Sequence, residues 1–151
     1  MSCAQAATLM LLHDRTGKCV DEATLRRESE VRGHPPGYDK NNGTSVLDIP
    51  TMMAEHGSPG AKPTLINGLS QSADQTAEQI QAETDKHSTI VLLQNPGHFV
   101  VVDGFRTAPD GTRYMQIRDP ALPGNQGCRE IEVGGSDWNN RLNGKTYMLT
   151  Q

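Results

Sequence analysis

Apolar residues in the first part of the chain recur at the spacing of an α-helix. Residues 3–13 are rich in alanine, leucine and methionine, which predicts a largely buried helix with Cys3 at its N-terminus. Residues 20–31 are mostly polar around Leu25, and Asp21 is a suitable N-cap for them. This second pattern predicts a short helix that is mostly exposed.

A segment rich in glycine, proline and asparagine follows at residues 32–42, and this composition predicts a surface loop. Thr44 or Ser45 can then cap a third helix, which Gly57 ends. Because Pro50 falls within the first turns of that helix, the pattern leaves open whether the helix kinks or starts later.

The remainder of the chain favours short strands. A polar helix is predicted over residues 72–86, between two strands at residues 64–69 and 89–93. Four further strands, separated by turn sequences such as Pro109-Asp110-Gly111, are predicted at residues 98–105, 113–118, 129–133 and 145–149. Helices followed by an antiparallel sheet predict an α+β fold.

Length and composition predict a single domain over residues 1–151 with a modest aliphatic core, because 34% of the residues are hydrophobic and 4% aromatic. The net charge is −4, and no run of basic residues alternates with aromatic ones, so we do not expect nucleic acid as a partner. No apolar stretch approaches the roughly 20 residues that cross a bilayer, so we expect a soluble domain without membrane insertion.

The three cysteines suggest thiol chemistry. Their number is odd, and none lies at zinc-binding spacing, so we expect at least one free thiol and neither a disulfide framework nor a metal or organic cofactor. A helix N-terminus stabilises a thiolate through its unpaired N–H groups and its dipole, which favours Cys3 as a nucleophile. We expect Cys19 and Cys128 to be exposed and unrelated to the chemistry.

Two other residues complete a candidate catalytic set. His98 opens an apolar strand directly after a turn, where an imidazole is rigidly held but still near solvent, so it is a candidate base for the thiol. Asp119 follows the next strand. If the two strands pair across the turn at residues 109–111, the Asp119 carboxylate approaches the His98 ring.

In this order, the residues resemble the papain-like cysteine peptidases, in particular the branch with the bacteriocin-leader (double-glycine) peptidase domains of bacterial exporters. The resemblance covers nearly the whole chain, and its motifs are the helix Ser2-Cys3-Ala4-Gln5-Ala6-Ala7, the strand Gly97-His98-Phe99-Val100-Val101-Val102-Asp103-Gly104 and the turn Ile117-Arg118-Asp119-Pro120. It implies a papain-like fold with N-terminal helices packed on a C-terminal sheet. It also implies Cys3 as nucleophile, His98 as general base and Asp119 as the residue that orients the histidine.

One feature departs from that family. Its members normally carry a glutamine a few residues before the nucleophile to complete the oxyanion hole, whereas only Met1 and Ser2 precede Cys3 here. Gln5 or Gln94 could replace it only if the fold brings an amide to the thiol. We therefore expect this sequence to be excised from a longer polypeptide.

The leading functional prediction is hydrolysis of a peptide bond in a protein or peptide substrate. The same triad supports deamidation or transamidation of a protein glutamine, because these reactions also begin with attack of a thiolate on an amide carbonyl. A third alternative is a catalytically silent binding module. By analogy with bacterial toxins that carry papain-like cargo, we expect an effector domain, secreted or delivered into a target cell, with a cognate immunity protein as a partner.

Several other residues receive structural predictions. Residues 32–42 and 122–127 are candidate walls of a substrate groove. Trp138 is expected to pack the C-terminal segment against the sheet, with a place in the groove as the alternative. We expect surface or loop positions for His13, His34, His56 and His87.

Overall fold

The computed structural model describes residues 3–122 and 127–151. In chain order the elements are α1 (Cys3–Thr16), α2 (Glu22–Arg32), the 3-10 helix η1 (Val46–Asp48), α3 (Ile49–Glu55), β1 (Lys62–Asn67), α4 (Ala73–Thr84), β2 (Thr89–Leu93), β3 (His98–Thr107), β4 (Arg113–Arg118), β5 (Cys128–Glu132), α5 (Ser136–Leu142) and β6 (Lys145–Thr150). The predicted α+β class is confirmed. Within these described residues, none of the helices has both the length and the apolar character that crossing a bilayer requires.

Side-chain caps start the helices close to where the sequence predicted them. The Asp21 carboxylate accepts a hydrogen bond from the N–H of Thr24 at 2.8 Å and begins α2. Ser45 caps η1, which leads directly into α3, and Pro50 lies in the first turn of α3, where a missing N–H costs no helical hydrogen bond. The third helix therefore starts later than Ser45, which was one of the two alternatives.

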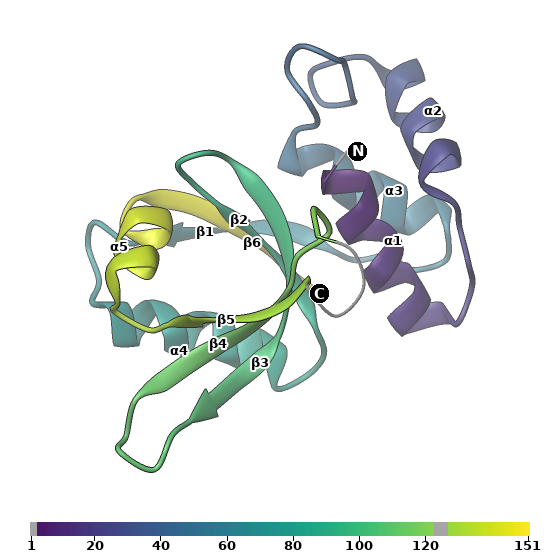
Figure 1. Cartoon of the computed structure of the whole chain (residues 1–151). Coiled ribbons are helices and arrows are strands. Elements are labelled where there is room, and N and C mark those ends of the chain that lie inside the picture. The colour runs from purple at the N-terminus through teal and green to yellow at the C-terminus, as the bar shows by residue number, and fades with distance from the viewer. Residues whose placement is uncertain (1–2, 123–126) are drawn as a thin grey trace.

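The strands form one six-stranded sheet in the order β1-β6-β2-β3-β4-β5, and each neighbouring pair is antiparallel. The strand boundaries lie within about two residues of the predicted ones. Strand β6 enters the sheet between β1 and β2, so this late segment joins the first strand to the other four (Figure 1).

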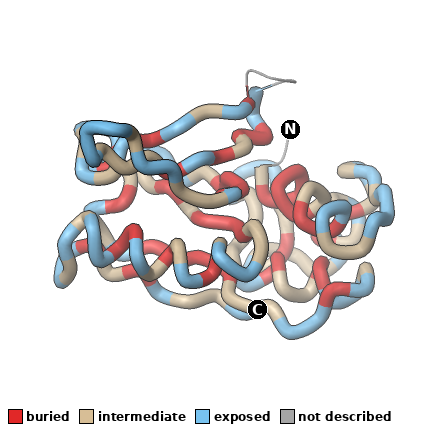
Figure 2. Tube along the Cα trace, turned by 90° about the horizontal axis from the view of Figure 1, so that it is seen from below, coloured by how far each residue is buried: buried red, intermediate tan, exposed pale blue. Residues whose placement is uncertain are grey.

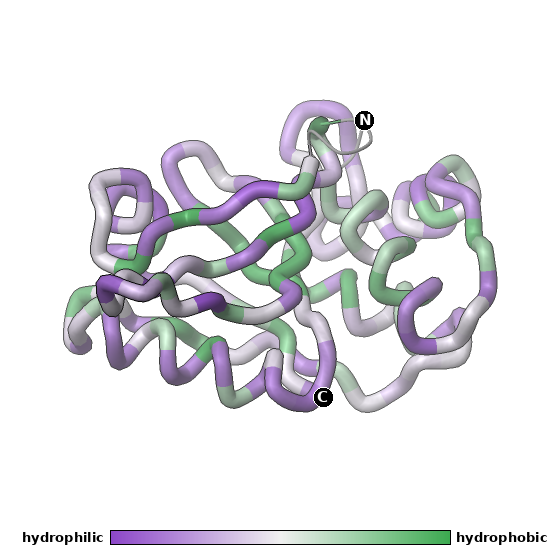
Figure 3. The backbone as a smooth tube through the Cα atoms, turned by 60° about the horizontal axis from the view of Figure 1, so that its bottom comes forward, coloured by the Kyte–Doolittle hydropathy of each residue, from purple (hydrophilic) through white to green (hydrophobic). Residues whose placement is uncertain are grey.

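The helices cover the sheet in two groups. Helices α1, α2 and α3 gather at one side of the molecule, whereas α4 and α5 lie at the other (Figure 1). Strand residues alternate between two buried clusters: Val91 and Val100 contact the cluster with α4 and α5, and Ile90 and Val101 contact the cluster with α1 to α3. Buried residues occur in both groups in Figure 2, and Figure 3 shows hydrophobic segments in both helices and strands.

Helix α5 is an element that the sequence pattern did not predict. It has seven residues, too few for a helical period to stand out. Trp138 and Leu142 on this helix are 2% and 1% exposed and belong to the cluster with α4. The prediction that Trp138 packs the C-terminal segment against the sheet is confirmed.

Candidate functional site

The thiol of Cys3 lies where the helical layer meets the sheet. Cys3 is the first residue of α1, and its side chain is free and partly buried. Helix α1 packs against β3, the strand that begins at His98. Ala4 and Ala7 are buried in the cluster that contains Phe99 of β3, and such small side chains allow a helix to approach a strand closely.

Strand register brings His98 and Asp119 together. Val101 pairs with Arg118, so one further step sets Asp119 opposite Val100, and His98 is the diagonal neighbour on the same face. The Nε2 atom of His98 lies 2.6 Å from Oδ1 of Asp119. The predicted pairing of these two strands is thus confirmed, and it carries the carboxylate to the imidazole.

The Asp119 side chain is fixed by several partners. It is 6% exposed, and Oδ1 also accepts a hydrogen bond from the N–H of Ala121 at 3.0 Å. Arg129 of β5 reaches Oδ2 at 3.3 Å. Burial raises the pKa of Asp119, but the bonds from His98, Ala121 and Arg129 outweigh it, so the pKa lies below its ordinary value.

The environment of Cys3 favours the thiolate. Burial of the thiol raises its pKa. A hydrogen bond with His98, backbone hydrogen bonds from Phe99 and Ala4, and the charge of His98 act in the opposite direction and prevail, so the pKa of Cys3 lies below its ordinary value.

The pKa of His98 shifts the other way. Its hydrogen bond with Cys3 raises the pKa, burial lowers it, and the hydrogen bond and charge of Asp119 raise it further, with a net rise. Because Nε2 is occupied by Asp119, the other ring nitrogen, Nδ1, is the one left for the thiol. Opposite shifts in adjacent groups favour a thiolate–imidazolium pair, whose two protonation steps belong to the pair.

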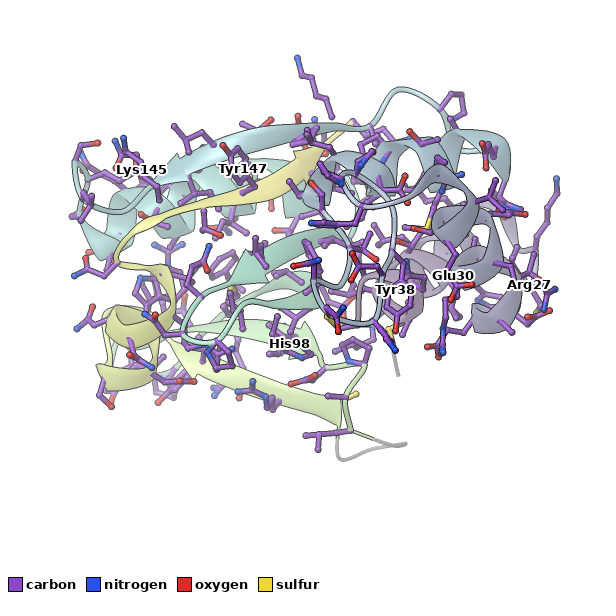
Figure 4. All side chains as sticks on the ribbon, turned by 90° about the horizontal axis from the view of Figure 1, so that it is seen from above. Arg27, Glu30, Tyr38, His98, Lys145 and Tyr147 are labelled. Carbon is purple, nitrogen blue, oxygen red and sulfur yellow. The ribbon has the colours of Figure 1, made fainter. Side chains whose placement is uncertain are left out.

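A pocket of about 630 Å³ opens beside Cys3. Its lining includes Cys3, Gln5, Tyr38, Phe99 and Tyr147. In the view of Figure 4, Tyr38 lies between His98 on the sheet and the labelled residues of α2. The loop at residues 32–42 thus lines the groove as predicted.

That loop is held by a buried network from α2. A Cβ atom built on Gly37 would lie 2.0 Å from the carbonyl oxygen of Ser29, so the backbone approaches α2 more closely than any side chain permits. The N–H of Tyr38 donates to the same oxygen at 3.1 Å. The Ser29 hydroxyl and the Arg32 guanidinium both donate to the fully buried carboxylate of Asp48. The loop therefore has defined anchors at its start.

A second pocket, of about 400 Å³, opens beside the imidazole. It is lined by His98 and Asp119 and also by Leu122, Arg129 and Arg141. Leu122 is one end of the second predicted groove wall, but residues 123–126 of that wall lie outside the described residues. The two pockets meet at Gly97, which lines both.

The two glutamines named as possible oxyanion donors are engaged elsewhere. The Gln5 amide nitrogen donates to the Thr44 hydroxyl at 2.8 Å, and that of Gln94 donates to the Thr146 hydroxyl at 3.3 Å. Neither contact directs an amide N–H to the thiol, although both residues line the pocket beside Cys3.

The remaining cysteines and histidines have other settings. Cys19 and Cys128 are exposed, as predicted. His56 and His87 contact Glu28 and Glu83, while His13 is exposed. His34 lies on the loop as predicted, but it also lines the larger pocket. Within residues 3–122 and 127–151, no three His, Cys, Asp or Glu side chains are grouped as a metal site.

Two contributors to the site were missed from sequence. Arg129 belongs to β5, and only knowledge of the β4–β5 register would place it near Asp119. The contribution of Phe99 comes from its backbone N–H, which the residue type does not reveal. Only its position directly after His98 pointed to a place in the site.

No family model matches the sequence, and no curated protein matches it significantly. Among solved structures, the fold is similar to that of the Amb a 11 cysteine protease, a major ragweed pollen allergen, in its proform, with a TM-score of 0.66 and 14% sequence identity over 99% of this chain. The chain spans 58% of the length of that protein. The likeness shows that the chain has a papain-like fold.

Proposed function

We propose that this chain is a cysteine peptidase that hydrolyses peptide bonds with Cys3 as nucleophile, His98 as general acid and base, and Asp119 as the residue that orients the imidazole. The observation that carries the proposal is the continuous contact from Cys3 through His98 to Asp119, with the pKa of the thiol lowered and that of the imidazole raised. Two residues from different layers rarely acquire complementary shifts by chance, and such shifts mark functional sites.

The reaction follows from the positions of these groups. The Cys3 thiolate attacks the carbonyl carbon, and the His98 imidazolium gives its proton to the leaving amine as the C–N bond breaks. His98, now neutral, takes a proton from water, which attacks the thioester and releases the carboxylic acid and the thiol. Asp119 holds the ring in one tautomer throughout.

The two pockets favour peptide hydrolysis over deamidation of a glutamine side chain. One is lined by Cys3 and the other by His98, and Gly97 lines both, so an extended chain can occupy both, with a segment on each side of the scissile bond. A glutamine side chain would need only one. The double-glycine branch, the effector role and the immunity protein stay predictions of the sequence.

The test compares wild type with Cys3→Ala and with Cys19→Ala as the matched control. Each protein is incubated with a set of unfolded proteins, and the products are measured by intact mass. We expect fragments from wild type and Cys19→Ala and none from Cys3→Ala. A Cys3-dependent mass gain that matches replacement of an amide NH₂ by OH, without fragments, would instead establish a deamidase, and no Cys3-dependent product would favour the binding module.

A further inference from the structure

We infer that the substrate is an acidic peptide segment, with a carboxylate on the acyl side of the scissile bond bound by Lys40 and one on the leaving-group side bound by Arg141. This inference rests on the proposed peptidase function. It names the substrate class for the same site.

The two pockets can be assigned to the two sides of the scissile bond. His98 gives its proton to the leaving amine, so the leaving segment must lie on the imidazole side, which is the pocket lined by His98 and Arg141. The acyl segment stays on Cys3 and therefore occupies the larger pocket, lined by Cys3 and Lys40.

The acyl-side pocket has positive charge without compensation. The chain contains 18 acidic residues against 14 lysines and arginines, yet no aspartate or glutamate lines this pocket among the residues that the structure describes. Lys40 has no carboxylate partner within that part of the chain. The adjacent Asp39 is occupied by Asn41 and Asn42, which hydrogen-bond to it at 2.7 and 2.8 Å. Leu92 and Phe99 line the same pocket and supply apolar surface for a side-chain stem.

The leaving-group pocket also has a positive charge without a carboxylate partner. The carboxylate among its described lining residues is that of Asp119, and it is already bound by His98 and Arg129. The Arg141 guanidinium donates to the carbonyl oxygen of Pro96 at 3.3 Å, and its Nε atom is buried without a hydrogen-bond partner. Within the described ranges, no carboxylate forms an ion pair with Arg141.

Two arginines of the sheet, unlike Arg141 of α5, have carboxylate partners. Arg106 and Arg118 each lie 2.8 Å from a carboxylate oxygen, of Glu130 and Asp103. A partly buried guanidinium left without such a partner is costly, and a substrate carboxylate would supply it with the bidentate acceptor that arginine favours. Lys40 in one pocket and Arg141 in the other thus favour a substrate segment that carries negative charge.

The first experiment measures the local potential at Cys3 without any peptide. Iodoacetate and iodoacetamide both alkylate the thiolate with loss of iodide, but only the former is an anion. We expect Lys40→Glu and Arg141→Gln each to lower the ratio of the iodoacetate to the iodoacetamide rate several-fold, on the order of tenfold for the charge reversal at low salt. Lys62→Glu on the exposed start of β1 is the control and should leave the ratio unchanged.

The second experiment measures peptide binding on the inactive Cys3→Ala protein. Short fluorescent peptides of alanine and glycine carry either glutamate or glutamine on both sides of the central bond. We expect tighter binding of the glutamate peptides, a loss of that preference in Lys40→Glu, and a partial loss in Arg141→Gln.

The two proposals fail in different ways. Unchanged alkylation ratios in both variants, or equal binding of the glutamate and glutamine peptides, would overturn the acidic substrate class while leaving the triad intact. Failure of the peptidase proposal shows instead as the absence of Cys3-dependent fragments, whatever the charge of the peptide. A Lys40→Glu protein that binds lysine peptides in preference would strengthen the assignment of the acyl side.

Discussion

The Asp119 carboxylate reaches the His98 imidazole because Asp103 of β3 bulges out of the ladder and does not pair with β4. The register shifts between Val102, which pairs with Ile117, and Gly104, which pairs with Gln116, so Asp103 forms a bulge. If Asp103 instead paired with Ile117, the outer register would continue inward and set Asp119 opposite Val101, so Asp119 and His98 would lie on opposite faces of the sheet. A one-residue slip moves a strand residue to the opposite face.

Insertion of one alanine after Ile117 should therefore separate the two residues, because each later residue of β4 moves to the opposite face of the sheet. We expect the insertion to lower the rate of Cys3 alkylation at mildly acidic pH by on the order of tenfold or more, because His98 loses the carboxylate that stabilises its charge. Deletion of Asp103 removes the bulge but leaves the paired residues on either side of it with their partners, so it is the control and should keep the rate. Circular dichroism should show that the sheet persists in both proteins, and an unchanged rate in the insertion protein would refute the role of the register.

The pH dependence of alkylation tests the thiolate–imidazolium pair. The pKa of Cys3 is lowered and that of His98 raised, so the reactive pair is present above the first and below the second. In a protein with Cys19 and Cys128 replaced by alanine, Cys3 should react at pH values well below those at which a free cysteine, with a pKa of about 8.5, becomes reactive. His98→Gln should move the profile to higher pH, toward that of a free cysteine. A profile insensitive to this change would contradict the pairing.

Asp119 and Arg129 should differ in the size of their effects. Asp119→Asn removes the charge that raises the pKa of His98, so we expect the basic limb of the pH–rate profile to move to lower pH and kcat/KM to fall by on the order of 10²-fold or more. Arg129 reaches the imidazole through Asp119, whose carboxylate it holds in place, so Arg129→Gln should move the limb in the same direction by less. Arg106→Gln, on an exposed pair of the same sheet, provides the matched control. Equal effects of Arg129→Gln and Arg106→Gln would show that Arg129 does not position Asp119.

The loop that lines the larger pocket depends on Gly37. Its φ is ordinary, so the need for glycine comes from the contact with the Ser29 carbonyl oxygen, where a Cβ atom would lie at 2.0 Å. We expect Gly37→Ala to lower the free energy of unfolding by about 1–3 kcal/mol and to raise KM more than it lowers kcat. Gly144→Ala has open space around the new methyl group and should do neither. Thermal unfolding and steady-state kinetics measure the two effects.

Much of the fold could be predicted because its signals are local. Asp21 and Ser72 cap helices with hydrogen bonds to the next turn, and these caps depend on neighbouring residues alone. The turn at residues 109–111 joins two strands that pair as predicted, and this pairing brings the end of β4 to the start of β3, where His98 lies.

The features that were missed depend on contacts between distant segments. The bulge at Asp103 leaves no trace in the alternation of apolar residues, and the insertion of β6 between β1 and β2 follows from packing of whole layers. Arg129 reaches Asp119 from a third strand for the same reason. The papain-like resemblance supplied the roles of the triad, but it supplied neither an oxyanion donor nor the charge of the pockets.

Cys3 and His98 belong to different layers, and this separation makes thiol reactivity a measure of tertiary assembly. An isolated α1 helix offers the thiol only its own N-terminal N–H groups. The lowered pKa further requires the imidazole of His98 and the backbone of Phe99, both of which come from β3. A chain that has formed its helices but has not yet docked them on the sheet therefore carries an ordinary, slow-reacting cysteine. Labelling of Cys3 at acidic pH during refolding would consequently report when α1 docks on β3, without a probe attached elsewhere in the protein.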